Sequence, residues 1–144
     1  MTTIRAAAAD RAAIANRTEE LFRRSGALRE GHFLLKSGRH SDRYLEKWAL
    51  LQHPDAAAEV CRLLAERALA VVTAAATEID LVAGPTTGGV LLAFEVGRLL
   101  GVRGIFAEEV AGEGGAHRRE FRRGFRIPPR ARVLMVDDIL TTGG

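Results

Sequence analysis

The chain has 144 residues and a mass of 15.6 kDa, which fits one domain and hardly more. Its composition is 47% apolar and 27% charged, which is ordinary for a globular protein and excludes a mostly disordered chain. No apolar run approaches the roughly 18 residues that span a bilayer, and residues 1–10 lack the apolar core of a signal peptide. The single cysteine, Cys61, excludes an intramolecular disulfide. These features predict a cytoplasmic protein.

Positive charge is concentrated in one segment. The net charge of +3 hides a local balance of +6 between His117 and Arg132, where seven arginines face Glu120 alone. The rest of the chain holds 14 basic and 17 acidic residues and is mildly acidic. The segment therefore predicts a partner with concentrated negative charge, either phosphate groups or a nucleic acid.

The first half of the chain predicts two helices around a hairpin. Apolar residues recur on one face of residues 10–24, as in a helix. Residues 32–36 and 40–46 are predicted to be short strands around a glycine-containing turn. Pro54 opens a second predicted helix, which runs to about residue 70.

The second half alternates between strands and helices. Three short apolar runs are predicted to be buried strands: residues 79–83, 104–107 and 133–136. We expect a helix over residues 90–100, a mobile glycine-rich loop over residues 108–116 and a further paired strand over residues 121–127. This alternation predicts an α/β fold with a parallel sheet flanked by helices.

The most informative segment ends the chain. The strand over residues 133–136 delivers Asp137 and Asp138 to the carboxyl edge of the sheet, where open α/β folds bind ligands. Residues 141–144, Thr-Thr-Gly-Gly, can bring backbone N–H groups and hydroxyls close to an anion. Carboxylates beside a phosphate would repel it, so we expect them to face sugar hydroxyls or a Mg²⁺-bound ligand. The segment predicts a sugar-phosphate site, and a tight turn with capping acids is the structural alternative.

Residues 133–144, Val-Leu-Met-Val-Asp-Asp-Ile-Leu-Thr-Thr-Gly-Gly, resemble the phosphoribosyl-pyrophosphate (PRPP) motif of type I phosphoribosyltransferases. Residues 33–44, Phe-Leu-Leu-Lys-Ser-Gly-Arg-His-Ser-Asp-Arg-Tyr, and residues 84–90, Gly-Pro-Thr-Thr-Gly-Gly-Val, resemble the orotate branch of that family. Residues 106–109 and 122–125 also fit, so the resemblance covers roughly residues 20–144.

The resemblance implies a type I phosphoribosyltransferase fold in a single, incomplete domain over residues 1–144. Within it, residues 27–47 correspond to a small N-terminal hood that recognises substrate. The family's last helix and strand would follow Gly144. The chain is therefore expected to be truncated and impaired as an enzyme.

The resemblance also implies an activity. Orotate phosphoribosyltransferases transfer the phosphoribosyl group of PRPP to orotate, giving orotidine 5′-monophosphate and pyrophosphate in pyrimidine biosynthesis. The implied cofactor is Mg²⁺, which is expected to arrive mainly with PRPP, so no residue is assigned as a metal ligand. A homodimer is expected, with no membrane or nucleic-acid partner.

The implied site residues form three groups. The catalytic residues are Lys36, Asp137 and Asp138, of which the two aspartates hold the ribose hydroxyls. PRPP is implied to contact Thr87, Gly88, Arg118, Arg119, Arg122, Arg123, Asp137, Asp138, Ile139, Leu140, Thr141, Thr142, Gly143 and Gly144. Orotate is implied to contact Lys36, Tyr44, Leu45 and Thr141.

The chain departs from the family pattern at two places. Many relatives carry an Arg-Lys pair where this chain has Glu108 and Glu109, and Gly88 stands where a lysine is common.

Two alternative functions remain open. A purine-type phosphoribosyltransferase shares the PRPP motif, and a non-catalytic nucleic-acid-binding protein could use the basic segment Arg118–Arg132.

Overall fold

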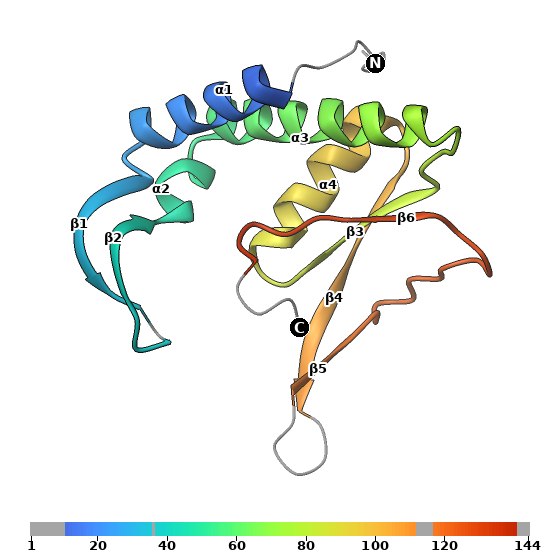
Figure 1. The fold of residues 1–144 in the computed structure, drawn as a ribbon. Coiled ribbons are helices and arrows are strands. Elements are labelled where there is room, and N and C mark those ends of the chain that lie inside the picture. Colours follow the sequence, from blue (N-terminus) through green and yellow to red (C-terminus); the bar gives the residue numbers. More distant parts are fainter. Residues whose placement is uncertain (1–10, 36, 112–116, 141–144) are drawn as a thin grey trace. The chain divides into compact units, whose positions relative to one another are not determined.

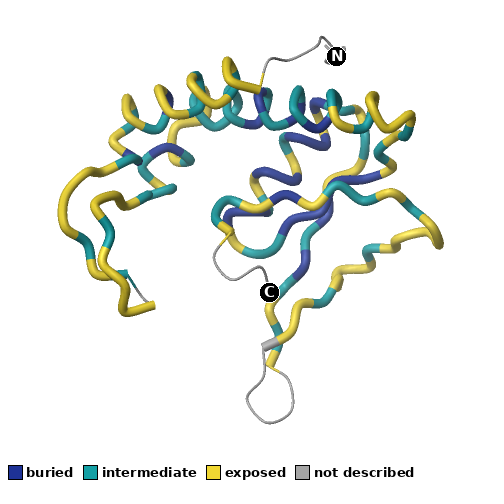
Figure 2. Tube along the Cα trace, in the orientation of Figure 1, coloured by how far each residue is buried: buried dark blue, intermediate teal, exposed yellow. Residues whose placement is uncertain are grey.

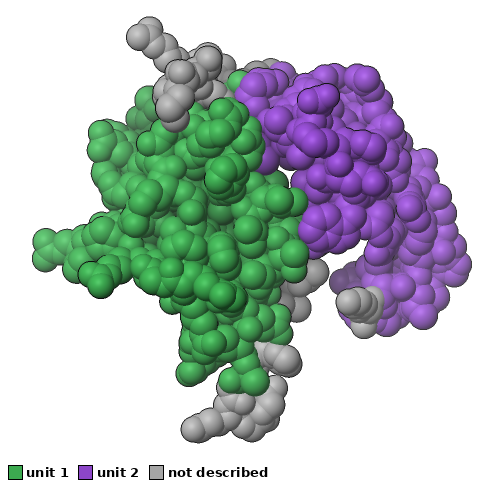
Figure 3. All heavy atoms as spheres, turned by 180° about the vertical axis from the view of Figure 1, so that it is seen from behind, with its two compact units in different colours: residues 1–7, 64–144 green, residues 8–63 purple. Residues whose placement is uncertain are grey.

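The computed structural model describes residues 11–35, 37–111 and 117–140. The chain divides into two compact units, each described here by itself (Figure 3). We call residues 8–63 the hairpin unit, and residues 64–144 together with residues 1–7 the sheet unit. Among the described residues, no helix combines the length and the apolar character that crossing a bilayer requires.

The hairpin unit is built around a small apolar core. Its elements are α1 (Arg11–Arg24), β1 (Leu28–Leu34), β2 (His40–Leu45), α2 (Lys47–Leu51) and the first half of α3 (Pro54–Ala74). Its buried core residues are Leu21, Ala27, Leu50 and Leu63. At the surface, Arg17 Nε donates to Glu59 Oε1 at 2.7 Å and links α1 to α3.

The strands β1 and β2 lie side by side as a two-stranded antiparallel sheet (Figure 1). Phe33 pairs with Ser41 and Leu34 with His40, and the register shifts between Glu30 and Phe33. Most residues of both strands are exposed. The prediction of a substrate-recognition hood over residues 27–47 stays a prediction, and the structure forms this hairpin there.

The sheet unit contains a four-stranded sheet in the order β5-β4-β3-β6. Its elements are β3 (Leu81–Pro85), α4 (Gly88–Leu100), β4 (Arg103–Ala111), β5 (His117–Glu120) and β6 (Val133–Met135). Strands β4 and β6 flank β3 in parallel, and β5 pairs antiparallel with β4. The predicted α/β fold is therefore confirmed, with an antiparallel edge strand on the parallel sheet.

Burial in the sheet unit is concentrated along β3 and α4 (Figure 2). Leu81, Val82 and Ala83 are fully buried because β3 is a central strand. This position explains why the sequence shows a continuous apolar run there rather than an alternating one. The predicted stop after α4 is also confirmed, since Gly101 follows the helix with a φ of 73°.

Two sequence-based predictions in this unit are wrong. Residues 108–111 continue β4 instead of starting a loop, and residues 112–116 lie outside the described residues. The partner of β4 is β5, not the predicted strand over residues 121–127. Arg123 and Gly124 have φ values of 60° and 74°, which interrupt an extended strand.

Candidate functional site

The predicted acidic pair lies beside the loop that leads from β3 into α4. Strand β6 pairs with β3, and the Val136 N–H extends this pairing by donating to the Ala83 carbonyl at 2.9 Å. Asp137 and Asp138 follow directly. The Asp138 carboxylate lies so close to Gly88 that a Cβ on Gly88 would overlap it. The acidic pair and the β3–α4 loop therefore meet at the carboxyl edge of the sheet.

The two aspartates have different surroundings. Asp137 is exposed, whereas Asp138 is half-buried with its Oδ2 atom shielded from solvent. The Asp138 N–H donates to Asp137 Oδ1 at 2.8 Å, which orients the Asp137 side chain. The Asp138 carboxylate thus faces the Gly88 loop, and the Asp137 carboxylate faces solvent.

The loop is positioned by a close approach of backbone to backbone. A Cβ on Gly84, in β3, would overlap the Gly89 carbonyl oxygen in α4. A Cβ on Gly89 would lie 2.6 Å from Pro85 Cδ. Only glycine fits both positions, so the first turn of α4 lies directly against the end of β3. The intervening peptide bond between Thr86 and Thr87 is cis.

The edge presents anion-binding and hydroxyl-binding groups together. Helix α4 has no acidic residue in its first turn, and the Thr87 hydroxyl makes no capping hydrogen bond in the described structure. The Val90 N–H donates to the Thr87 carbonyl at 3.3 Å, and the N–H groups of Gly88 and Gly89 are the ones that can serve an anion. The nearby carboxylates of Asp137 and Asp138 can accept hydrogen bonds from hydroxyl groups. This combination suits a sugar phosphate.

The predicted PRPP-binding arginines are paired with acidic residues. Arg123 donates to both carboxylate oxygens of Glu108, with its shortest contact at 2.7 Å. The hydrogen bonds between the two side chains lower the pKa of Glu108 and raise the pKa of Arg123. Arg118 and Arg122 both pair with Glu120, at 2.6 and 3.0 Å. The local positive charge is thus divided among ion pairs rather than presented as one bare patch.

Arg119 connects the β4–β5 ribbon to the loop before α4. Its Nη1 donates to the Thr86 carbonyl oxygen at 3.2 Å, and its Nη2 lies 3.8 Å from Glu109 Oε2. Arg119, one of the four arginines predicted to bind PRPP, thus contacts the loop that also carries Thr87 and Gly88. The structure therefore brings Arg119 to the same edge as the aspartates.

The remaining predicted residues fall into three groups. Lys36 and residues 141–144 lie outside the described residues. Ile139 is half-buried and Leu140 is exposed, directly after the acidic pair. Tyr44 and Leu45 belong to β2 of the hairpin unit, where the Tyr44 ring lies 5.5 Å from the Phe33 ring. Their expected roles toward orotate stay predictions.

Sequence reasoning missed the structural partners of the site. Gly84 and Gly89 allow the end of β3 and the first turn of α4 to approach closely. The sequence signal for this close approach is a glycine at the end of an apolar strand, followed by two more glycines. Glu108 and Glu109 were noted as departures from the family pattern. Their role as arginine partners could have been suspected from two acids beside a basic segment.

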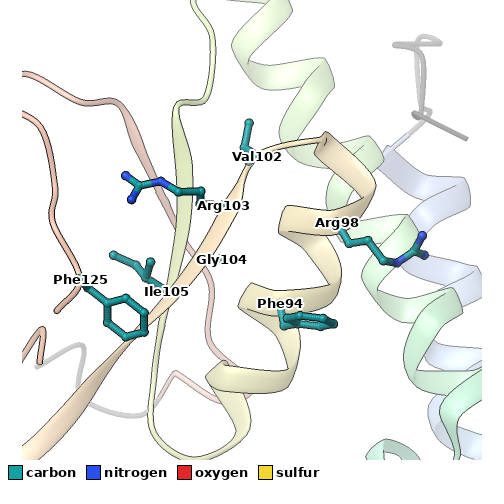
Figure 4. A pocket seen from close by; sticks show the side chains of 7 residues that line it. All are labelled: Phe94, Arg98, Val102, Arg103, Gly104, Ile105 and Phe125. Carbon is teal, nitrogen blue, oxygen red and sulfur yellow. The ribbon is translucent and has the colours of Figure 1, made fainter. Parts of the chain in front are cut away.

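A separate groove of about 340 Å³ lies at the other end of the sheet unit (Figure 4). Phe94 and Arg98 on α4 line it together with Arg103, at the start of β4, and Phe125. Arg103 stands at the amino end of β4, whereas the aspartates follow the carboxyl end of a parallel strand. The groove is therefore not part of the candidate site.

Comparisons with known proteins identify relatives of the chain. No protein-family model matches it. The chain is 48% identical over 124 residues to the orotate phosphoribosyltransferase of Pelotomaculum thermopropionicum, a match that covers 86% of this chain and 60% of that protein. Other curated relatives at 41–46% identity carry the same name. The chain thus spans about 60% of the length of these relatives.

Solved structures agree with this relationship. The crystal structure of Mycobacterium tuberculosis orotate phosphoribosyltransferase in complex with Fe(III) dicitrate has a TM-score of 0.57 and 25% identity, covering 90% of this chain and 70% of that one. Adenine phosphoribosyltransferase from Saccharomyces cerevisiae shares the fold with a TM-score of 0.61 at 20% identity, covering 90% and 76%. The chain is therefore a homologue of the orotate phosphoribosyltransferases and has the fold of type I phosphoribosyltransferases.

Proposed function

We propose that the protein transfers the phosphoribosyl group of PRPP to orotate, giving orotidine 5′-monophosphate and pyrophosphate. The relatives that share 41–48% identity over most of this chain are named for this reaction. The observation that carries the proposal is the placement of Asp138 against Gly88 at the carboxyl edge of the sheet. It unites the acidic pair with the loop that resembles the family's pyrophosphate loop.

In this proposal the carboxyl edge holds PRPP through two sets of groups. Asp137 and Asp138 accept hydrogen bonds from the ribose hydroxyls, and the loop at Thr87 and Gly88 holds the pyrophosphate with its backbone N–H groups. Residues 141–144 hold the 5′-phosphate, and Ile139 and Leu140 also contact PRPP. These contacts fix the ribose so that its bond to pyrophosphate breaks as a bond forms to a ring nitrogen of orotate.

The arginines supply positive charge where pyrophosphate leaves. Arg119 is the first candidate because it already contacts the loop carbonyl of Thr86. We propose that Arg118, Arg122 and Arg123 contribute by exchanging part of their pairing with Glu108 and Glu120 for phosphate oxygens. Guanidinium groups bind phosphate and carboxylate with the same paired geometry, which permits such an exchange.

The donor set of the edge suits Mg²⁺ that arrives with the substrate. Mg²⁺ prefers oxygen ligands and is commonly held by one or two carboxylates plus substrate phosphates. Asp137 and Asp138 offer such carboxylates to an ion that PRPP brings with it. When bound with PRPP, Mg²⁺ neutralises charge on the departing pyrophosphate.

We further propose that Lys36, Tyr44 and Leu45 contact orotate, that the active protein is a homodimer, and that it works in the cytoplasm. Tyr44 is exposed and Leu45 is half-buried, so both side chains have surface that a ligand can reach. Sedimentation of the purified protein tests the dimer, and a sedimenting monomer at micromolar concentration contradicts it.

The proposed reaction is tested by incubating the protein with PRPP, Mg²⁺ and either orotate or adenine. Any orotate that is consumed should be matched by an equal amount of released pyrophosphate, and adenine should give no product. Turnover of adenine instead of orotate supports the purine-type alternative. RNA binding that weakens steeply with salt, without PRPP binding, supports the nucleic-acid alternative and rejects the proposal.

A further inference from the structure

Two histidines of the hairpin unit lie in contact across the strands. His32 Nε2 is 2.6 Å from His40 Nδ1, and the two rings stack with centroids 4.8 Å apart and planes 28° from parallel. His40 pairs with Leu34, and His32 stands two residues earlier on the same strand as Leu34. The antiparallel register, rather than a metal-binding sequence spacing, creates the contact. Both side chains are exposed.

The short distance defines the chemistry of the pair. Two ring nitrogens at 2.6 Å share one hydrogen, because one imidazole donates its N–H to the lone pair of the other. When the donating ring shifts this hydrogen to its other nitrogen, both facing nitrogens carry lone pairs, and a divalent transition metal can bind the two. Zinc–nitrogen bonds of about 2.0–2.1 Å require the nitrogens to separate to about 3.3 Å in tetrahedral geometry. Exposed side chains can make that small adjustment.

We propose that the His32–His40 pair binds one transition-metal ion of the kind that imidazole prefers, such as Zn²⁺, Ni²⁺ or Cu²⁺. The described residues hold no group of three or more metal-binding side chains, so water completes the coordination. Imidazole ligands favour these ions over Mg²⁺, which prefers oxygen. The histidine site therefore selects different metal ions from the Mg²⁺ that accompanies PRPP. Metal binding at this site does not depend on the proposed reaction.

The metal would act as a cross-strand link in a weakly supported hairpin. A two-stranded sheet is marginally stable by itself, and β1–β2 is such a sheet with mostly exposed residues. At its base, the Glu46 N–H donates to the Ala27 carbonyl at 2.7 Å. His40 stands at the other end of the hairpin, where β2 begins. With a metal bridge there, the hairpin is linked at both ends, by the metal at one end and by this hydrogen bond at the other.

Titration calorimetry with Zn²⁺ and with Mg²⁺ tests the site. We expect one Zn²⁺ per chain and no comparable binding of Mg²⁺. His32→Gln and His40→Gln should each weaken Zn²⁺ binding at least about tenfold, since even outer-sphere changes cost about 10–100-fold. His53→Gln is the matched control, because His53 is also exposed in the hairpin unit. Unchanged Zn²⁺ affinity in both pair variants overturns the proposal.

Amide hydrogen exchange provides a readout of the cross-strand link. Zn²⁺ should slow exchange in residues 28–45 of the wild-type protein and leave it unchanged in the His40→Gln variant. If a variant loses the hairpin without metal, the Cu²⁺ electron paramagnetic resonance spectrum of the wild-type protein decides. Coupling to two imidazole nitrogens is expected, and a spectrum without nitrogen coupling contradicts the site. Neither measurement requires phosphoribosyl transfer, so its outcome is separate from that of the proposed function.

Discussion

The carboxyl edge of the sheet unit and the β1–β2 hairpin both carry residues implied to bind substrate, but different interactions hold them. At the sheet edge, Gly84 and Gly89 bring two backbone segments into contact, and Asp138 fits against Gly88. In the hairpin, exposed side chains meet in local pairs, such as His32 with His40. Where backbone segments are closely packed, an added side-chain atom is poorly accommodated, whereas substitutions in exposed side-chain pairs are tolerated.

This difference predicts where substitutions act. At the sheet edge, a change in the acidic pair should affect ligand binding far more than folding, whereas a change in the glycines should affect folding first. In the hairpin, the effect of a substitution of similar size should remain within the hairpin.

The double substitution Asp137→Asn and Asp138→Asn should weaken PRPP binding the most. Each lost charge-assisted hydrogen bond is worth about 1.5–3 kcal/mol, so the pair is worth about 3–6 kcal/mol if the losses add. The melting temperature should change little, because the residues follow the strand instead of filling the core. Calorimetry with PRPP and Mg²⁺ measures the loss. Glu19→Gln on α1 is the control, and PRPP affinity equal in both proteins rejects the ribose-binding role.

The substitutions Gly84→Ala and Gly88→Ala should separate stability from binding. A Cβ on Gly84 meets the backbone of Gly89, so overpacking should lower the free energy of unfolding by about 1–3 kcal/mol or more. A Cβ on Gly88 meets the Asp138 side chain, which can rotate away. Gly88→Ala should therefore keep the fold and weaken PRPP binding.

Urea unfolding and PRPP calorimetry on both variants measure this separation. Phe94→Ala is the control, since Phe94 is exposed on the same helix and its loss should change neither quantity much. Equal loss of stability in the two glycine variants would show that Asp138 is as rigidly held as the backbone.

The aromatic pairs of the two units should respond differently to the same substitution. Phe33 and Tyr44 lie 5.5 Å apart in the hairpin, and Phe106 and Phe125 lie 5.1 Å apart in the sheet unit. Such a ring pair contributes about 0.5–1.5 kcal/mol beyond its buried area. Phe33→Leu should therefore speed amide exchange in residues 28–45 alone, whereas Phe106→Leu should lower the global unfolding midpoint. A global loss from Phe33→Leu contradicts the contrast between the units.

The sequence predicted the elements with strong periodicity and missed those set by contacts between distant residues. The apolar runs around Val82 and Leu134 and the amphipathic helices were recognisable because burial imposes a pattern on neighbouring residues. The five-residue helix α2 is too short to show such a pattern. Strand β5 could not be located because its position depends on how far β4 extends, which is a tertiary property.

The candidate site was predictable to a similar extent. Motifs placed Asp137, Asp138 and the Gly88 loop at one edge, since parallel strands end at a common side of the sheet. The partners of the arginines were not predictable, because Glu108 and Arg123 are 15 residues apart and meet only through the β4–β5 ribbon. The same holds for His32 and His40, whose contact depends on strand register.

The smallest expected effect concerns the ion pair at the opposite end of the sheet from the site. Arg132 donates to both carboxylate oxygens of Asp80, at 2.7 and 3.0 Å, and its backbone N–H donates to the same carboxylate at 2.7 Å. These bonds connect the start of β6 to the start of β3. Hydrogen bonds from the Arg132 side chain, then from its backbone, lower the pKa of Asp80 from 3.8 to about 2.

Because the pKa of Asp80 is lowered in the folded state, its stabilising contribution is present above pH 3.8 and is lost as the pH falls toward 2. Asp80→Asn should therefore lower the urea midpoint slightly at pH 5, and the difference from wild type should shrink as the pH falls from 3.8 through 2. Glu78→Gln removes only the outer contact to Arg132, at 3.0 Å, and should have less effect. The pair is exposed to solvent, so its effect should also shrink with added salt. A difference between wild type and Asp80→Asn that is constant from pH 5 to pH 2 would show that the ion pair does not hold β6 beside β3.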